Sequence, residues 1–411
     1  MSLCRIVSSV TLAAMLWLAG SAQAVDKETV LYNFSNSSGG SGPFGGLVMD
    51  QSGNMYGATL TGEIFEMSPN GAGGWNFSEL TTCGQCEYPV GPLVMDHVGN
   101  LYGSDFFGYV FEVSPNGSGG WTPSTVYAFS GGTDGSAPST VILDNAGNLY
   151  GVNASGGSSG VGYVFELSPI SGGGWSLTHL HDFDGTDGGG GSAAAGVVGA
   201  LIMDGSGNLY GTAYSGGNST TCSSGCGVVF KLTNNAGVWT EAVLYNFDGT
   251  HGANPDAPLL MDASGNLYGT TTAGGPADVG VVFETSFHGI TPYTRVLYSF
   301  TGTGADGAVP LAGLIMDGSG SLYGTTEAGG GSFNCSVGTI NGCGTAFKLT
   351  RSGIHWKESI LHDFKAEGDG GFPGTLISDD SGNLYSDGFV GGLSNIGVVF
   401  ELSPQTASTG K

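Results

Sequence analysis

Carboxylate and imidazole side chains recur in short turns that each precede an apolar segment of the chain. Asp134, Asp187, His251, Asp306 and Asp369 each stand directly before a glycine. Their oxygen and nitrogen atoms can hydrogen-bond a sugar or a protein ligand, and carboxylates can also bind cations. Asp-Gly turns explain the same residues without any ligand. These five residues are therefore candidate ligand-binding positions, with turn formation as the alternative.

One of these turns resembles a calcium-binding loop. Asp182, Asp184 and Asp187 place three carboxylates within six residues. The third carboxylate is out of phase with an EF-hand and no glutamate closes the loop, so the EF-hand pattern is not met. We keep an irregular calcium site at these three residues as a hypothesis, and calcium is the cofactor that the sequence suggests.

Patterns typical of catalysis lack their structural context. Gly156 to Gly160 matches the G-x-S-x-G nucleophile pattern, but it lies in a Gly/Ser-rich loop and not between a strand and a helix. His179, His181 and His362 lie in segments that read as outer strands, where we expect surface positions and not catalytic bases. The sequence therefore favours a protein that is not an enzyme.

The most regular element has an aspartate, two small or polar residues and Gly-Asn, followed by Leu-Tyr-Gly in its cleanest form. An aspartate at the first position and a glycine at a positive φ are typical of a tight hairpin turn, so we expect these aspartates to be structural. Seven cation sites are the alternative. We expect the tyrosine to pack between repeats with its hydroxyl bonded to a backbone group. The aspartates are Asp50, Asp96, Asp144, Asp204, Asp262, Asp317 and Asp379.

A repeat of this size with four short apolar segments per unit is the pattern of a β-propeller blade. We expect repeats near residues 43–82, 89–129, 138–183, 197–247, 257–300, 311–364 and 373–403. In the fourth unit the expected strands A to D are 200–204, 208–213, 227–232 and 242–247. Continuous apolar runs such as Val228 to Phe230 indicate sheets covered on both faces, as in stacked blades. The sequence thus predicts an all-β protein, a single seven-bladed β-propeller with four-stranded blades.

The two ends of the repeat region are complementary. Val30 to Phe34 reads as a fourth strand with no strands before it, and Val398 to Leu402 reads as a third strand with none after it. Antiparallel pairing of the two segments would complete the last blade and close the ring, which removes two open edges.

Six cysteines form three close pairs. The pairs are Cys83 with Cys86, Cys222 with Cys226, and Cys335 with Cys343. In an exported protein this spacing predicts three local disulfides. The first pair also fits the redox C-x-x-C pattern, but the βαβ context of that pattern is missing.

Charge and the first segment restrict partners and location. The chain has 34 acidic and 9 basic residues and a net charge of −25, which disfavours nucleic acid as a partner. Residues 1–24 read as a secretory signal, residues 25–404 as the propeller and residues 405–411 as a short tail. We expect a secreted or periplasmic monomer with no membrane insertion after signal cleavage.

The units resemble the GloVer-type tandem repeat of secreted bacterial proteins. Leu260 to Thr271, Gly274-Gly275 and Gly280 to Phe283 match its core almost in full. Ser321 and Ser386 depart from it. The resemblance implies an exported repeat protein and implies no reaction.

We expect a non-enzymatic binding or surface-interaction module, with a glycan or protein ligand on the face formed by the D-to-A and B-to-C loops. These loops are the longer and more varied ones. An extracellular hydrolase or lyase acting on a polysaccharide or ester, with carboxylates at the channel mouth, is the first alternative. A structural envelope protein is the second.

Overall fold

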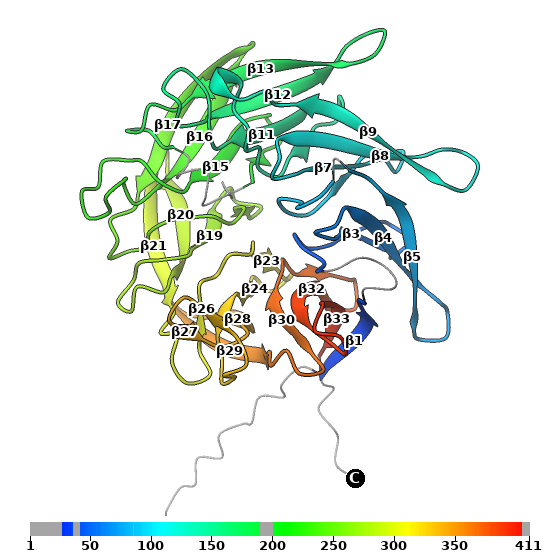
Figure 1. The fold of residues 1–411 in the computed structure, drawn as a ribbon. Helices are drawn as coiled ribbons and strands as arrows, with labels where there is room; N and C mark the ends of the chain where they lie inside the picture. The colour runs from blue at the N-terminus through cyan, green and yellow to red at the C-terminus, as the bar shows by residue number, and fades with distance from the viewer. Residues whose placement is uncertain (1–26, 36–41, 85, 190–199, 405–411) are drawn as a thin grey trace, which may run out of the picture.

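The computed structural model of the 411-residue chain is a closed ring of seven antiparallel blades, a seven-bladed β-propeller (Figure 1). The structure describes residues 27–35, 42–84, 86–189 and 200–404. The expected signal segment and tail lie outside the described residues. Each blade runs from a short inner strand A to a long outer strand D.

The strands of blades 1 to 4 are as follows. Blade 1 has β2 (Val48–Met49), β3 (Met55–Ala58), β4 (Glu63–Pro69) and β5 (Trp75–Thr82); blade 2 has β6 (Val94–Met95), β7 (Leu101–Ser104), β8 (Tyr109–Pro115) and β9 (Trp121–Ala128). Blade 3 has β10 (Ile142–Leu143), β11 (Leu149–Asn153), β12 (Tyr163–Pro169) and β13 (Trp175–Asp182); blade 4 has β14 (Ile202–Met203), β15 (Leu209–Ala213), β16 (Val228–Asn235) and β17 (Val238–Asn246).

Blades 5 to 7 follow the same order. Blade 5 has β18 (Leu260–Met261), β19 (Leu267–Thr271), β20 (Val281–His288) and β21 (Thr291–Ser299); blade 6 has β23 (Ile315–Met316), β24 (Leu322–Thr326), β28 (Thr345–Ser352) and β29 (His355–Asp363). Blade 7 has β31 (Ile377–Ser378), β32 (Leu384–Gly391), β33 (Val398–Ser403) and β1 (Lys27–Asn33), with β30 (Gly370–Pro373) beside β32. Loops add β22 (Gly307–Ala308), β25 (Ala328–Gly329), β26 (Ser336–Val337), β27 (Ile340–Asn341) and the 3₁₀ turn η1 (Gly132–Asp134).

The predicted ring closure is confirmed. Strand β1 pairs antiparallel with β33, with Glu28 opposite Leu402 and Val30 opposite Phe400. The first described strand of the chain is therefore the outer strand of blade 7 (Figure 1). This pairing satisfies the edge of β33, which would otherwise be open.

The strands of blade 4 differ in length from the prediction. Inner strand β14 has two residues because Asp204 already belongs to the turn that follows it. The outer hairpin is longer than expected, since pairing of β16 with β17 continues out to Asn235 and Val238. Trp239 thus lies inside the outer strand and not before it.

The Leu-Tyr-Gly element packs neighbouring strands and blades together. A Cβ on Gly211 would lie 2.7 Å from the ring of Phe230 in the same blade, so only glycine leaves room for that buried ring. The tyrosine packs between blades, as expected: Tyr150 contacts Trp239 of the next blade, with ring centroids 6.4 Å apart. The same Tyr–Trp contact joins blades 1 and 2, 2 and 3, and 7 and 1.

The seven turn aspartates are hydrogen-bonded in the way that a structural role requires. Asp204 accepts bonds from the backbone N–H groups of Ser206 and Asn208, both at 2.9 Å, and from the Asn208 side chain at 2.8 Å. The Tyr210 hydroxyl donates to the same carboxylate at 3.1 Å. The hydroxyl partner is therefore this carboxylate and not the backbone group that the sequence predicted. The hydrogen bonds of the turn therefore occupy the donors that surround the aspartate carboxylate.

The three cysteine pairs form disulfides within single loops. Two of these disulfide-bonded loops accept a hydrogen bond from the loop that leads into the next blade. The backbone N–H of Asn254 donates to the Cys226 carbonyl at 2.9 Å, and that of Phe372 donates to the Cys343 carbonyl at 2.8 Å. Among the described residues no helix has the length and apolar character needed to span a bilayer.

Candidate functional site

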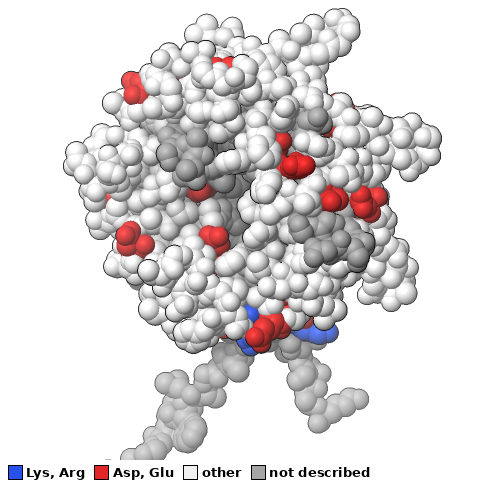
Figure 2. All heavy atoms as spheres, viewed as in Figure 1, with Lys and Arg blue, Asp and Glu red and all other residues white. Residues whose placement is uncertain are grey.

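A pocket of about 310 Å³ lies on the ring axis, where the loops that lead into the inner strands meet. We call it the axial pocket. Its wall includes at least one residue from every blade: Phe44, Val90, Thr140, Ala200, Asp256, Leu311 and Thr375. These residues precede strand A, so the pocket lies on the loop face, the side of the ring formed by the D-to-A and B-to-C loops. Figure 2 shows a hollow near the ring axis, with acidic side chains spread over the surface in view and Lys and Arg side chains at one edge.

Three carboxyl groups line the axial pocket. Asp256 and Asp387 are 5% and 2% exposed, and Glu327 is half-buried. Burial raises the pKa of Asp256 well above its usual range, and the charge of Glu327 raises it further. Burial also raises the pKa of Glu327, and it raises that of Asp387 to about 6. Oδ1 of Asp256 is shielded from solvent and has no hydrogen-bond partner among the described residues. A shielded carboxyl oxygen without a partner disfavours the ionised form, in line with the raised pKa of Asp256.

Aromatic rings stand beside these acids. Phe44 and Phe389 both line the pocket and meet edge to face, with centroids 5.7 Å apart. Tyr88, Phe106 and Phe107 follow on loops of the same face, and each is about half exposed. The Tyr88 and Phe107 rings are 5.6 Å apart. A group of exposed rings of this kind is a candidate surface for contact with a ligand or partner.

The loops around the pocket have an unusual backbone. Tyr88, Asn254, Val309 and Phe372 have φ between +52° and +56°, and each directly precedes a proline. Residues other than glycine seldom adopt this conformation, and a β-branched residue such as Val309 does so rarely. Each of the four donates its N–H to a carbonyl of the preceding blade, at 2.8–3.0 Å. Strain of this kind persists where surrounding contacts fix it, and it is concentrated at functional sites.

The five candidate ligand-binding residues lie elsewhere on the loop face, and none lines the axial pocket. Asp134 accepts from the backbone and hydroxyl of Ser130, and Asp306 does the same from Thr301. His251 pairs with Asp248 at 2.8 Å. Asp187 and Asp369 each pair with a histidine of the preceding outer strand, at 2.8 Å and 3.1 Å. All five side chains brace their own loops.

The three aspartates of the calcium hypothesis do not converge among the described residues. Asp182 accepts from the Ser158 backbone N–H and pairs with His179 at 2.8 Å. A register shift in the pairing of β12 with β13 lies between these two residues of β13. The Asp184 carboxylate accepts from Thr186. Asp187 instead belongs to a different cluster.

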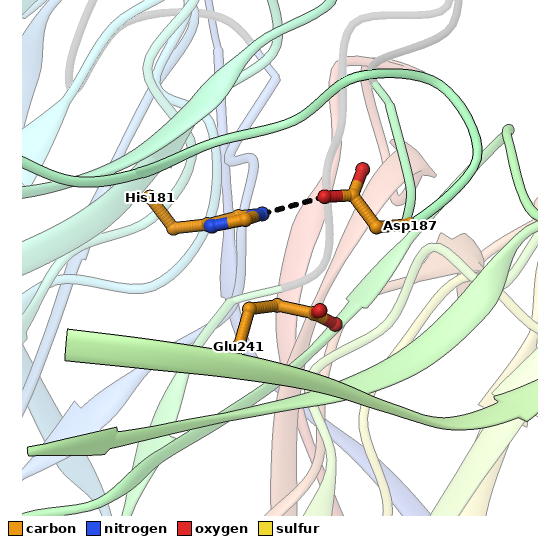
Figure 3. Close-up of side chains that lie close together, drawn as sticks. All are labelled: His181, Asp187 and Glu241. Atoms are coloured by element: carbon orange, nitrogen blue, oxygen red, sulfur yellow. Dashed lines mark hydrogen bonds and ion pairs between the residues drawn. The ribbon is translucent and has the colours of Figure 1, made fainter.

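That cluster consists of His181, Asp187 and Glu241, whose ligand atoms all lie within 4.8 Å of one another (Figure 3). His181 is on the outer strand of blade 3, Asp187 is in the loop that follows it, and Glu241 is on the outer strand of blade 4. The sequence placed His181 and His362 at the surface. Both are instead largely buried, with side chains 22% and 17% exposed, and each ring nitrogen Nε2 is hydrogen-bonded to an aspartate of the next loop.

The axial acids were missed in the sequence, although a signal exists there. When the seven repeats are aligned on the turn aspartate, each acid occupies a position that carries no acid in the other repeats. Asp387 replaces Ala, Ser, Val or Thr, and Glu327 replaces Leu, Phe, Ala, Tyr or Thr. Asp256 stands where the other repeats have Phe, Val, Pro or Leu. A single acid at a position where the other repeats carry only uncharged residues is a signal that the repeat pattern does not explain.

Solved structures share this architecture. Two extracellular domains of hybrid two component systems from B. thetaiotaomicron match with TM-scores of 0.56, at 11% and 12% identity over 92% and 93% of the chain. The chain spans about two fifths of those proteins, 41% and 40% of their length. YCF48 from Cyanidioschyzon merolae matches with a TM-score of 0.53 at 13% identity, covering 92% of this chain and 99% of its own. At these identities the likeness shows the fold alone. No curated protein matches the sequence.

Fold and site together define the chain as a seven-bladed propeller with a pocket on its axis. The Gloeobacter/Verrucomicrobia repeat model matches residues 62–222, 105–340 and 202–411. The chain belongs to this repeat family, which confirms the resemblance seen in the sequence.

Proposed function

We propose that the protein is an extracytoplasmic binding module that takes a neutral glycan into the axial pocket. The observation that carries the proposal is the placement of three largely buried carboxyl groups beside two phenylalanine rings in one pocket of about 310 Å³. A pocket of this volume suits a ligand of one or two sugar units.

The chemistry of the pocket fits a sugar. A sugar ring has hydroxyls along its edge and C–H groups on its faces. The hydroxyls would bond the carboxyl groups of Asp256, Glu327 and Asp387, and the C–H face would pack on Phe44 or Phe389. The net charge of −25 disfavours an anionic ligand. A neutral glycan fits both the charge and the lining.

Location outside the cytoplasm is supported by three disulfides, which form and persist in oxidising compartments. The expected signal at residues 1–24 points the same way. A protein ligand on the loop face is the alternative binding partner, for which the exposed rings of Tyr88, Phe106 and Phe107 would provide the contact.

The test is a glycan array, followed by titration calorimetry with each neutral oligosaccharide that the array selects. We expect Phe44→Ala and Asp256→Asn to weaken binding at least tenfold. Tyr293→Ala and Asp380→Asn are matched controls, since both residues are exposed and neither lines the axial pocket. Tyr293 lies near the start of β21, next to the C-to-D turn, and Asp380 lies in an A-to-B turn. Equal affinity of all four variants, or an array with no neutral ligand, would contradict the proposal.

A second function has one observation in its favour. Asp256 and Glu327 interact electrostatically in the pocket, and the pKa of Asp256 is raised by burial and by this neighbour. Pairs of carboxyl groups held in different protonation states are typical of acid–base hydrolysis of glycosidic bonds. Release of reducing ends from the bound oligosaccharide, lost in Asp256→Asn, would establish the hydrolase. Stable binding of the oligosaccharide without its cleavage would instead support the binding module.

A further inference from the structure

Three junctions between neighbouring blades repeat one polar triplet at the outer strands. Each triplet has a ring side chain on one outer strand, an aspartate in the loop after it and a glutamate on the next outer strand. The triplets are His181, Asp187 and Glu241; Tyr298, Asp306 and Glu358; and His362, Asp369 and Glu28. The glutamates are equivalent by register, since they pair with Leu232, Leu349 and Leu402 of strands β16, β28 and β33.

One carboxylate oxygen of each of these glutamates lacks a partner among the described residues. The Oε1 atoms of Glu28, Glu241 and Glu358 are shielded from solvent and accept no hydrogen bond from the described residues. At the junction of blades 3 and 4, burial raises the pKa of Glu241 to about 7, and the charges of Asp187 and Asp184 add to this effect. A carboxylate with one shielded oxygen that has no donor, beside a second carboxylate, is unfavourable when ionised unless a positive charge lies close to both.

The junction of blades 3 and 4 has the most compact donor set. His181 Nε2 lies 2.8 Å from Asp187 Oδ2. The Glu241 side chain lies beside this pair, with its carboxylate toward that of Asp187 (Figure 3). All three ligand atoms are within 4.8 Å of one another. One tetrahedral ion with bonds of about 2.0–2.2 Å to nitrogen and oxygen needs ligand atoms about 3.3–3.6 Å apart. The three side chains would therefore have to move closer together by about 1 Å when they bind the ion.

We propose that His181, Asp187 and Glu241 bind one divalent transition-metal ion of the Zn²⁺ type, which joins blades 3 and 4. Imidazole and carboxylate donors suit Zn²⁺, whereas Ca²⁺ takes six to eight oxygen ligands. Two carboxylates balance the charge of the ion, and the Glu241 oxygen gains the partner that it lacks. The ion joins two blades far from the axial pocket, so its role is structural and independent of the proposed function.

The triplet with Tyr298 is an internal control. It has the same two acids, and Asp306 Oδ1 also lacks a partner, but it has a phenol in place of the imidazole. A neutral phenol is a poor ligand for Zn²⁺ compared with imidazole. Glu358→Gln therefore removes an equivalent glutamate without touching the proposed site.

The experiment is Zn²⁺ titration of the full chain after chelator treatment, by competition with a fluorescent chelator. All variants carry His362→Gln, so that the similar donors at the ring-closing junction do not contribute. We expect one tight Zn²⁺ in this background, at least tenfold weaker binding in Glu241→Gln and in His181→Gln, and no change in Glu358→Gln. Millimolar Ca²⁺ should not compete.

Thermal unfolding provides the second measurement. Saturating Zn²⁺ should raise the melting temperature of the parent and of Glu358→Gln by about 3 °C, and leave Glu241→Gln unchanged. Without metal, Glu241→Gln should melt no lower than the parent, since it removes an unpaired charge, and this result also shows that the variant folds. Equal Zn²⁺ affinity in the parent and Glu241→Gln, or absence of binding in the parent, would overturn the proposal.

Discussion

Replacing Asp387 by asparagine should stabilise the protein at neutral pH and have little effect in acid. Asp387 is 2% exposed, and burial raises its pKa to about 6 from an ordinary value of 3.8. Its carboxylate accepts from the Gly46 N–H at 3.2 Å, a bond that an asparagine oxygen can keep, and from the Ser386 hydroxyl at 3.4 Å. The change therefore removes an ionisable group and retains the shape and the hydrogen bond from Gly46.

The sign and size follow from the two pKa values. Because the folded-state value is the higher one, ionised Asp387 destabilises the native state, and the free energy of unfolding falls as pH rises from about 4 to about 6. A pKa change from 3.8 to about 6 corresponds to about 3 kcal/mol, lost in full above pH 6. Asp387→Asn should therefore exceed the parent by about 3 kcal/mol at pH 7.5 and match it near pH 3.5.

Urea unfolding at pH 3.5, 5 and 7.5 measures this difference. Asp380→Asn is the control, because Asp380 is an exposed aspartate in the same blade. A stability difference between Asp387→Asn and the parent that is the same at all three pH values would refute the reasoning, since it would come from packing and not from ionisation.

Three further predictions concern the scaffold, each measured by urea unfolding. Asp204→Ala removes the acceptor of four hydrogen bonds and should cost about 2 kcal/mol, and a loss below about 0.5 kcal/mol would argue against the turn role. Gly211→Ala should lower the free energy of unfolding by about 1–3 kcal/mol, because its Cβ would collide with the buried ring of Phe230. Gly205→Ala is the control and should be neutral, since a Cβ there meets nothing within 4 Å. Equal effects of the two substitutions would contradict the packing argument. Joint replacement of Cys335 and Cys343 by serine should cost about 2–3 kcal/mol, and unchanged stability would mean that this disulfide restrains little.

The ring was predictable because the same turn and strand pattern recurs in every repeat. Seven copies of the same turn and the same apolar strands leave little doubt about the architecture, and the unmatched strands at residues 30–34 and 398–402 indicate the closure. Strand ends were less predictable. The expected strands 227–232 and 242–247 leave residues 233–241 outside any strand, but pairing of β16 with β17 continues to Asn235 and Val238, because pairing with a neighbouring strand outweighs local turn preference.

The polar clusters could not be predicted from local sequence. His181 and Asp187 are six residues apart, but Glu241 lies on the next blade, and only blade stacking brings it to them. The tyrosine hydroxyls illustrate the same limit at short range. The sequence predicts a backbone partner for Tyr210, whereas the turn geometry presents the carboxylate of Asp204 at 3.1 Å. Contacts that depend on how elements pack are set by the fold as a whole.

The positions of the three axial acids bear on how a ring of similar blades could bind an asymmetric ligand. A ring of seven equal blades presents seven equal surfaces around its axis, and a small ligand has no such symmetry. Binding one orientation of such a ligand requires positions where the blades differ. Asp256, Glu327 and Asp387 are such positions, and they belong to blades 5, 6 and 7, while Phe44 of blade 1 and Phe389 of blade 7 provide the rings. The pocket is therefore polarised, with acids along one arc and rings next to it. Exchange of the three acids for the residues of the other repeats should preserve the ring and abolish the proposed glycan binding, because it removes the polar groups that distinguish blades 5, 6 and 7.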